Sequence, residues 1–244
     1  MGAHISSLSS GNPLDHVNTM LTGLSTMQKG LPKDSDPITD SFRFEKMDST
    51  GTLSSKEACE LLNSGKPIVI KEERTFVNRN PGDPSGEKSK IEFRNWADSE
   101  DKDIVASSDR WSSSKLSKTT STVINNPDEL ESFYNIETHQ PARNEVEKLG
   151  QMLDKIESHV GNPTHNMLTL TDSKGKPVSP LMAALMLKQG AAIKVETFTP
   201  FVTKSELGWN LSETSTIKTP EQAGKWTPAP NKPAVSKGDG WEMD

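Results

Sequence analysis

Seven consecutive apolar residues, Leu181 to Leu187, constrain the fold of this chain more than any other segment. Ser179 and Pro180 before this run are helix-start signals, and Gly190 after it is a stop signal. A helix that is apolar on every side has no face to offer to water, so it must be buried. Apolar residues on both sides of it predict short strands. We therefore expect a small α+β module over residues 163–203.

The rest of the composition argues against one large core. Only 31% of the residues are hydrophobic, and 34 acidic residues outweigh 28 basic ones. Few apolar residues favour short folded segments between polar linkers. We expect a mostly α, modular and partly disordered chain, with small α+β modules, a short coiled-coil-like helix and no internal repeat. The expected segments are a docking helix in 1–31, a linker in 32–53, a possible α+β subdomain in 54–96, a Ser/Thr-rich linker in 97–137, an oligomerisation helix in 138–162, the α+β module in 163–203 and a polar tail in 204–244.

Several classes of function are disfavoured by what the sequence lacks. Cys59 is the single cysteine, so neither a disulfide framework nor a multi-cysteine zinc site is expected. The net charge of −6 and the scarcity of basic clusters argue against direct binding of nucleic acid. We find no nucleophile elbow, phosphate-binding loop or zinc-protease motif. We therefore expect no enzymatic activity, no cofactor and no metal.

The strongest periodic pattern predicts a helix that associates with itself. Between Pro141 and Gly161, apolar residues recur at alternating spacings of four and three, as in a coiled-coil seam. The same spacing also fits an amphipathic helix that packs within its own domain, and the sequence leaves both interpretations open. The predicted oligomerisation residues are Ala142, Val146, Leu149, Leu153, Ile156 and Val160.

A second amphipathic pattern lies near the N-terminus. Pro13 suits the first turn of a helix, and Gly30 and Pro32 end it. Gly23 and several Ser and Thr residues give this helix a low intrinsic propensity, which favours a helix that orders on a partner over one that packs on its own chain. The predicted partner-binding residues are Leu14, Val17, Leu21, Leu24 and Met27.

Four residues fit modification patterns. Gly2, with Ser at position six, matches the N-myristoylation pattern, and binding to a membrane is expected only if Gly2 is acylated. Ser99 lies among acidic residues, and Thr219 and Thr227 each precede a proline, so all three are candidate phosphorylation sites. Each phosphate would add about −1.5 to −2 charge. A solubilising spacer explains these hydroxyls equally well.

The order of these parts resembles the phosphoprotein of rhabdovirus-like negative-strand RNA viruses. The matching features are the docking helix, a polar linker, the oligomerisation helix and a C-terminal module. The resemblance implies a non-catalytic polymerase cofactor that self-associates, chaperones free nucleoprotein, links nucleoprotein to the polymerase, and occurs in the host cytoplasm and the virion.

A second resemblance concerns the first fifty residues. They are rich in serine, lack acidic residues before Asp15 and carry the Gly2 pattern. This leader is similar to those of type III secreted bacterial effectors that are lipidated in the host cell. It implies an alternative function inside host cells.

Overall fold

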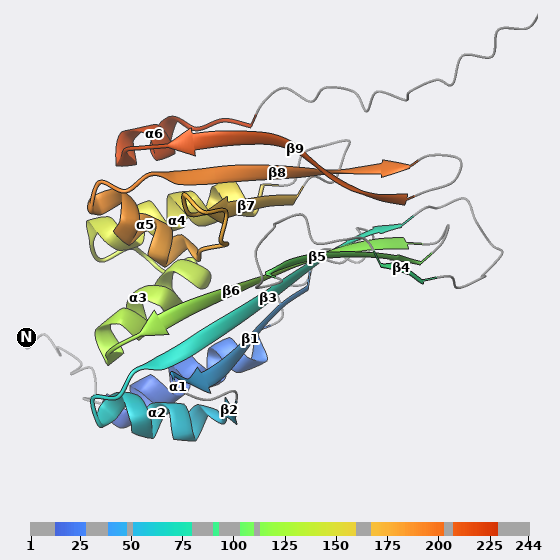
Figure 1. Cartoon of the computed structure of the whole chain (residues 1–244). Helices are drawn as coiled ribbons and strands as arrows, with labels where there is room; N and C mark the ends of the chain where they lie inside the picture. Colours follow the sequence, from blue (N-terminus) through green and yellow to red (C-terminus); the bar gives the residue numbers. More distant parts are fainter. Residues whose placement is uncertain are drawn as a thin grey trace, which may run out of the picture.

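The computed structural model describes residues 13–27, 39–47, 51–79, 90–92, 103–109, 113–159, 167–202 and 207–228. These residues form six helices and nine strands (Figure 1). Their order is α1 (Pro13–Thr26), β1 (Thr39–Lys46), β2 (Thr52–Leu53), α2 (Ser55–Asn63), β3 (Ile68–Arg79), β4 (Lys90–Glu92), β5 (Ile104–Asp109), β6 (Ser113–Ile124), α3 (Pro127–Glu137), α4 (Glu145–Glu157), β7 (Met167–Thr171), α5 (Pro180–Lys188), β8 (Ile193–Val202), β9 (Leu207–Ile217) and α6 (Pro220–Lys225).

The strands form two antiparallel sheets. Sheet A has the order β2-β1-β3-β6-β5-β4, and sheet B has the order β7-β8-β9. Figure 1 shows sheet B and α6 at one end of the molecule and α1 and α2 at the other. Helices α3, α4 and α5 lie between the two sheets.

This α+β architecture corrects the expectation of a mostly α, modular chain. The largest difference falls in 97–137, the expected Ser/Thr-rich linker, which contains β5, β6 and α3. Strand β6 pairs with β3 over twelve residues and lies in the middle of sheet A. Less buried Ser117, Thr119 and Ser121 alternate there with inward-facing residues that include Thr120 and Thr122, and threonine fits well on a pleated surface. The expected tail, 204–244, likewise contains β9 and α6.

The structure also contains an internal repeat. Residues 13–137, the N-terminal unit, have the order helix, strand, short return strand, helix, two long strands and helix. Residues 145–225, the C-terminal unit, follow the same order, and a bridge between Thr171 and Pro177 stands in for the short return strand. Strands β4 and β5 are an addition to the N-terminal unit. They lie between β3 and β6 in the chain, and in the sheet they extend the edge beyond β6.

The repeat extends to strand register. In each unit the two long strands, β3 with β6 and β8 with β9, pair an isoleucine with an isoleucine. The strand before the second helix, β1 or β7, pairs a phenylalanine or leucine with an isoleucine or valine of the first long strand. These pairs are Ile68 with Ile124, Ile193 with Ile217, Phe44 with Ile70, and Leu170 with Val195.

The turns and caps repeat as well. The second helix of each unit is followed by a glycine with positive φ, Gly65 at 75° and Gly190 at 81°. Ahead of the third helix, the Asn125 N–H donates to the Glu129 side chain at 2.7 Å, and the Lys218 N–H donates to Gln222 at 2.7 Å. The expectation of no repeat is therefore wrong. The two units share the order of their elements, their strand register and their turns, but few identical residues.

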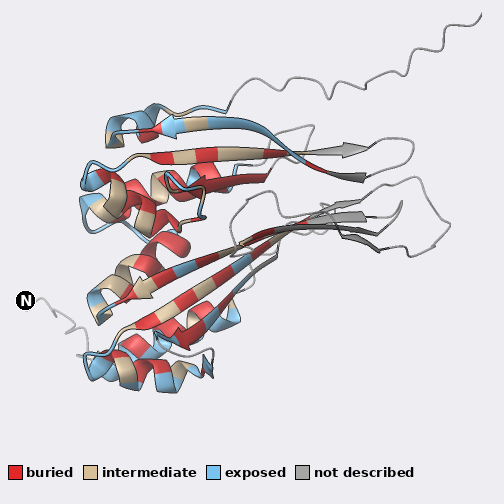
Figure 2. Ribbon diagram, in the orientation of Figure 1, coloured by how far each residue is buried: buried red, intermediate tan, exposed pale blue. Residues whose placement is uncertain are grey.

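Three apolar clusters fill the interior. The first lies between sheet A and α1, α2 and α3, and it includes Leu181 of α5. The second lies between sheet B and α4, α5 and α6. The third joins Phe76, Ile104 and Leu116 of sheet A to Met167, Phe198 and Trp209 of the C-terminal unit. The two units therefore share one continuous body, with buried residues facing inward from both sheets (Figure 2).

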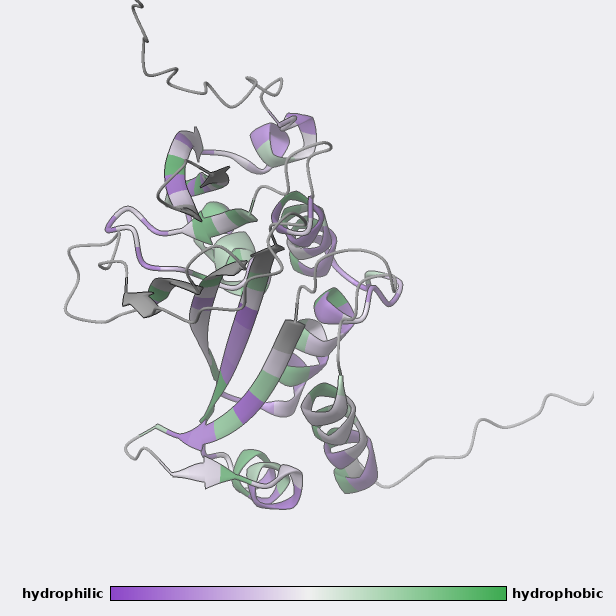
Figure 3. Ribbon diagram, turned by 90° about the vertical axis from the view of Figure 1, so that its right-hand side faces the viewer, coloured by the Kyte–Doolittle hydropathy of each residue, from purple (hydrophilic) through white to green (hydrophobic). Residues whose placement is uncertain are grey.

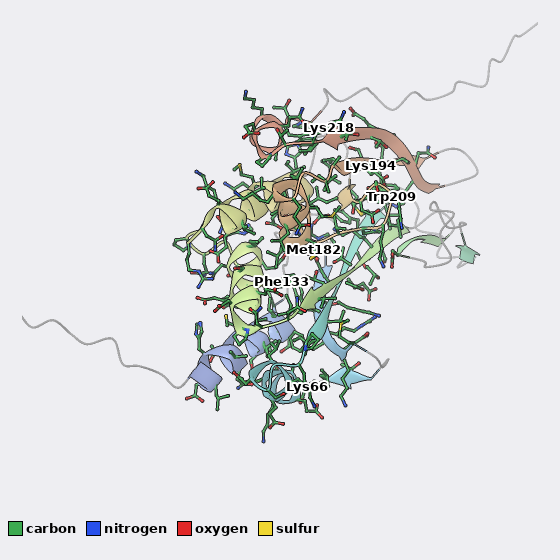
Figure 4. The ribbon with its side chains drawn as sticks, turned by 60° about the vertical axis from the view of Figure 1, so that its left-hand side comes forward. Lys66, Phe133, Met182, Lys194, Trp209 and Lys218 are labelled. Atoms are coloured by element: carbon green, nitrogen blue, oxygen red, sulfur yellow. The ribbon has the colours of Figure 1, made fainter. Side chains whose placement is uncertain are left out.

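The alternation along the strands explains which side is buried. Figure 3 shows hydrophobic and hydrophilic residues following each other along the long strands. In β3, Ile68, Ile70 and Phe76 face inward, whereas Lys71 and Glu73 face outward. Figure 4 places Phe133 inside the molecule, and Lys66 and Lys218 toward its opposite ends.

Candidate functional site: a charge cluster between the two units

Four charged side chains meet where the two units join. Strand β3 carries Glu72 and Arg74, β6 carries Lys118, and Glu157 is the last residue of α4. At most 3% of any of these side chains is exposed. Each strand places them at inward-facing positions, between the apolar residues of the same face. We call these four residues the charge cluster.

Glu157 is the centre of the charge cluster. Its Oε1 pairs with Lys118 Nζ and accepts the Leu170 N–H of β7 at 3.0 Å. Its Oε2 lies 3.7 Å from Arg74 Nη1. One carboxylate from the C-terminal unit therefore contacts two cations of the N-terminal unit and also binds the first strand of sheet B.

Glu72 completes the charge cluster on the other side of Arg74. Its Oε1 lies 3.4 Å from Arg74 Nη2, and its Oε2 accepts the Thr120 hydroxyl at 3.0 Å. These four side chains bring together two cations and two carboxylates. This balance matters because a buried charge is tolerated only when it is paired and hydrogen-bonded. Nearby, Thr122 of β6 donates to Ser179, the N-cap of α5, at 2.8 Å.

A second polar contact joins the units at the surface. The Arg143 guanidinium, just before α4, pairs with Glu131 of α3 and donates to Glu147 Oε1 at 2.6 Å. Ser132 of α3 donates to the same Glu147 oxygen at 3.0 Å. Burial alone would raise the pKa of Glu147, but these hydrogen bonds from Arg143 and Ser132 hold that pKa below its usual value. Hydrogen bonds to Glu147 likewise raise the pKa of Arg143.

Close backbone approach accompanies this contact. A Cβ on Gly150 of α4 would lie 2.3 Å from Cδ1 of Ile136 in α3. A larger residue at position 150 would therefore force the Ile136 side chain or one of the two helices to shift.

The predicted oligomerisation residues face the interior of their own chain. Leu149, Leu153 and Ile156 are buried in the second apolar cluster, and Val146 is partly buried against it. Ala142 is exposed ahead of the helix, which begins at Glu145 with Asn144 as its N-cap, and Val160 lies outside the described residues. In this structure the seam is covered by the chain's own α3, α5 and sheet B.

The predicted partner-binding residues are also mostly internal. Val17, Leu21 and Leu24 are buried in the first apolar cluster, and Met27 packs partly against it. Leu14 is 48% exposed. The apolar face of α1 therefore covers α2, α3 and β1.

The candidate modification sites lie in different places. Thr219 and Thr227 are exposed on both sides of α6, and Thr219 is the N-cap of that helix. Gly2 and Ser99 lie outside the described residues.

Cysteine and histidine side chains are common nucleophiles and metal ligands, so the surroundings of Cys59, His139 and His159 bear on function. Burial raises the pKa of the Cys59 thiol, which donates to the Leu14 carbonyl at 3.5 Å. His159 is exposed, and His139 Nε2 lies 3.5 Å from Asp154 Oδ2. Within the described ranges, no three His, Cys, Asp or Glu side chains converge as metal ligands.

Sequence reasoning missed the charge cluster entirely. A signal was present in β6, where Leu116, Lys118, Thr120, Thr122 and Ile124 occupy every second position. Such a period of two predicts a strand whose inward face is polar in its middle. The carboxylate that pairs with Lys118 comes from α4, 39 residues further along the chain, and no local pattern points to it.

The comparisons add no relative. Neither known protein families, nor curated proteins, nor solved structures provide a match to this chain. Among the described residues, no helix has the length and apolar character needed to cross a bilayer.

Proposed function

We propose that this protein is a non-catalytic adaptor, a rigid body of two fused units that binds other proteins. The observation that carries the proposal is the charge cluster. Glu72, Arg74, Lys118 and Glu157 are at most 3% exposed and lie between the two units. Their position suits them to fix the two units relative to each other, because no substrate reaches side chains with so little exposure.

The outer face of sheet A is the docking surface we propose. Helices α1, α2 and α3 pack on the opposite face through Phe42, Phe44, Ile68, Ile70 and Ile124. On the outer face, Glu45 accepts ion pairs from Arg43 at 3.2 Å and from Lys71 at 3.1 Å. Hydroxyl side chains continue this face along β3 and β6, where Thr75 and Ser117 lie 2.9 Å apart. A flat surface of mixed charges and hydroxyl groups matches the polar character of many non-obligate protein interfaces.

The partners we propose follow from the sequence resemblance. They are nucleoprotein and polymerase of a negative-strand RNA virus. The self-association expected at the seam of α4 needs another location, because its apolar residues are internal. The alternative of a lipidated effector depends on Gly2, which lies outside the described residues, and nothing in the described structure favours it.

Affinity capture from the native source with full-length protein tests the adaptor. Three baits are compared: the wild type, an outer-face variant and a control. The outer-face variant carries Arg43→Glu and Lys71→Glu, which reverse two charges on the outer face of sheet A. The matched control carries Lys56→Glu and Lys66→Glu on the exposed side of α2 and its following turn, with the same change in net charge. We expect nucleoprotein and polymerase to bind the wild type and the control, and to be lost from the outer-face variant.

Circular dichroism should show the same fold for all three proteins, because surface ion pairs contribute little to stability. Recovery of an identical set of proteins by all three would contradict the proposed docking surface. Failure of the wild type to retain either expected partner would contradict the viral function.

A further inference from the structure

The outer face of sheet A carries a row of hydrogen-bond donors. Strand register places Arg43 of β1 opposite Lys71 of β3, and Lys71 opposite Ser121 of β6. Directly opposed residues share a face of the sheet, and their Cβ atoms are about 5 Å apart. A guanidinium, an ammonium and a hydroxyl therefore follow one another across three strands. We call these three residues the donor row.

Glu45 holds the two cations of the donor row together. Its Oε1 accepts a hydrogen bond from Arg43 Nε at 3.2 Å, and its Oε2 lies 3.1 Å from Lys71 Nζ. Only 11% of the Glu45 side chain is exposed, against 48% for Arg43 and 31% for Lys71. A partner that approaches this face therefore meets mainly the cations. Because Glu45 already orders them, less conformational entropy is lost when they bind.

The donor row has donors left for a second anion. Within the described chain, the two Nη groups of Arg43 donate no hydrogen bond, since its contact with Glu45 uses Nε alone. The end of a guanidinium that carries both Nη groups matches the two oxygens of a carboxylate. Two positive charges and one negative charge meet here, so a carboxylate from outside would balance them.

The next row along the sheet carries the opposite charge. Glu73 follows Lys71 by two residues on the same face, and the register places it between Ser41 and Thr119. Glu73 is exposed, and no ion pair joins it to another residue that the structure describes. Strand geometry separates the two rows by about 6.7 Å, and side chains two positions apart in an extended peptide have the same separation.

We propose that the outer face of sheet A recognises an extended segment of a partner protein in which an acidic and a basic residue are two positions apart. The acidic side chain binds Arg43 and Lys71, and the basic side chain binds Glu73. Charge complementarity selects this occupant, because a second acidic residue would face Glu73 and a second basic residue would face the donor row. Such recognition rests on the docking surface proposed for sheet A and is independent of the viral identity of the partner.

A library of random seven-residue peptides displayed on phage tests this pattern, with the full-length protein as bait. We expect an Asp or Glu two positions from a Lys or Arg to be about three times as frequent among selected peptides as in the unselected library, since each exposed ion pair contributes little. Acidic and basic residues at adjacent positions point to opposite sides of an extended peptide and should not be enriched. Selection without enrichment of the two-position spacing would contradict the proposal.

Two variants separate the contributions of the two rows. Arg43→Gln with Lys71→Gln removes the cations, and we expect it to lose the enrichment of acidic residues. Glu73→Gln removes the anion, and we expect it to lose the enrichment of basic residues. The matched control, Lys56→Gln with Lys66→Gln, removes two exposed cations elsewhere and should select the same peptides as the wild type. Identical peptides from all four proteins would overturn the proposal.

Fluorescence anisotropy with one selected peptide measures the size of the effect. Replacing its acidic residue with glutamine should weaken binding to the wild type by about fivefold, the most that an exposed ion pair typically provides. The same replacement should leave binding to Arg43→Gln/Lys71→Gln unchanged, and equal weakening for both proteins would also overturn the proposal. Affinity capture decides the identity of the partner separately, so failure to capture nucleoprotein or polymerase would contradict the viral function but not the peptide pattern.

Discussion

Replacing Lys118 with methionine removes the closest cation of the charge cluster while retaining most of the side-chain volume. Glu157 then keeps the Leu170 N–H at 3.0 Å and the longer ion pair with Arg74 at 3.7 Å, but it loses its closest cation. Breaking a buried pair by removing one partner typically costs about 3–5 kcal/mol, because it leaves an uncompensated charge. The remaining contacts of Glu157 lead us to expect the lower end, about 3 kcal/mol. For a chain of this length, that corresponds to a Tm about 6–12 °C lower.

A double-mutant cycle in urea measures this effect. Lys118→Met and Glu157→Gln are each expected to destabilise the protein, and the double variant should be more stable than the sum of the two losses by about 2 kcal/mol. The control, Lys66→Met, removes an exposed lysine and should change the free energy of unfolding by less than about 0.5 kcal/mol. If Lys118→Met costs less than about 1 kcal/mol, the charge cluster does not hold the two units together as we reason.

Three further outcomes are expected. Gly150→Ala should lower the free energy of unfolding by about 1–3 kcal/mol despite the higher helix propensity of alanine, because the new Cβ would lie 2.3 Å from Ile136 Cδ1. In the same urea assay, adding Ile136→Val should recover part of this loss. The pKa of Glu147 is lowered in the folded state, so this carboxylate stabilises the protein above its unfolded-state pKa of about 4.3. That stabilisation is lost as the pH falls through the lower folded-state pKa. In urea titrations from pH 6 to pH 2, the free energy of unfolding should therefore fall less steeply for Arg143→Met than for the wild type. Ser54→Ala, which removes the N-cap hydroxyl of α2, should cost about 1 kcal/mol by thermal unfolding, and an unchanged Tm would show that this cap contributes nothing.

Local signals in the sequence predicted several helices and strands correctly. Ser179 with Pro180 begins α5, as expected, and a similar local signal, the capping box of Ser54 and Glu57, begins α2. These predictions succeed because a cap is formed by residues within one turn of each other. Strand β7 and the first part of β8 also fall where the apolar residues on both sides of α5 predicted them.

The fold class could not be predicted by the same means. Strand β6 has a polar inward face, and its burial depends on groups that arrive from elsewhere in the chain. Lys118 requires Glu157, Thr120 requires Glu72, and Thr122 requires Ser179. Counting apolar residues treats such a segment as a linker, because a polar residue whose burial is compensated by a distant partner looks the same as an exposed one.

The seam in α4 shows a related limit. Apolar residues at alternating spacings of four and three indicate that one side of a helix is buried, but they do not indicate what covers that side. In this structure the covering groups are α5, α3 and sheet B of the same chain. The repeat was invisible for the opposite reason, since Gly65 and Gly190 preserve a turn while most side chains around them differ.

The position of Glu157 sets an order of events during synthesis. Arg74 and Lys118 leave the ribosome well before Glu157, the carboxylate that contacts both of them. Until α4 emerges, Lys118 lacks the carboxylate that pairs with it in the folded protein, so closing sheet A early would bury this cation without Glu157. The N-terminal unit must therefore wait, partly open, for the second unit to be translated, and a nascent chain stalled before residue 157 should be an easy target for proteases and chaperones.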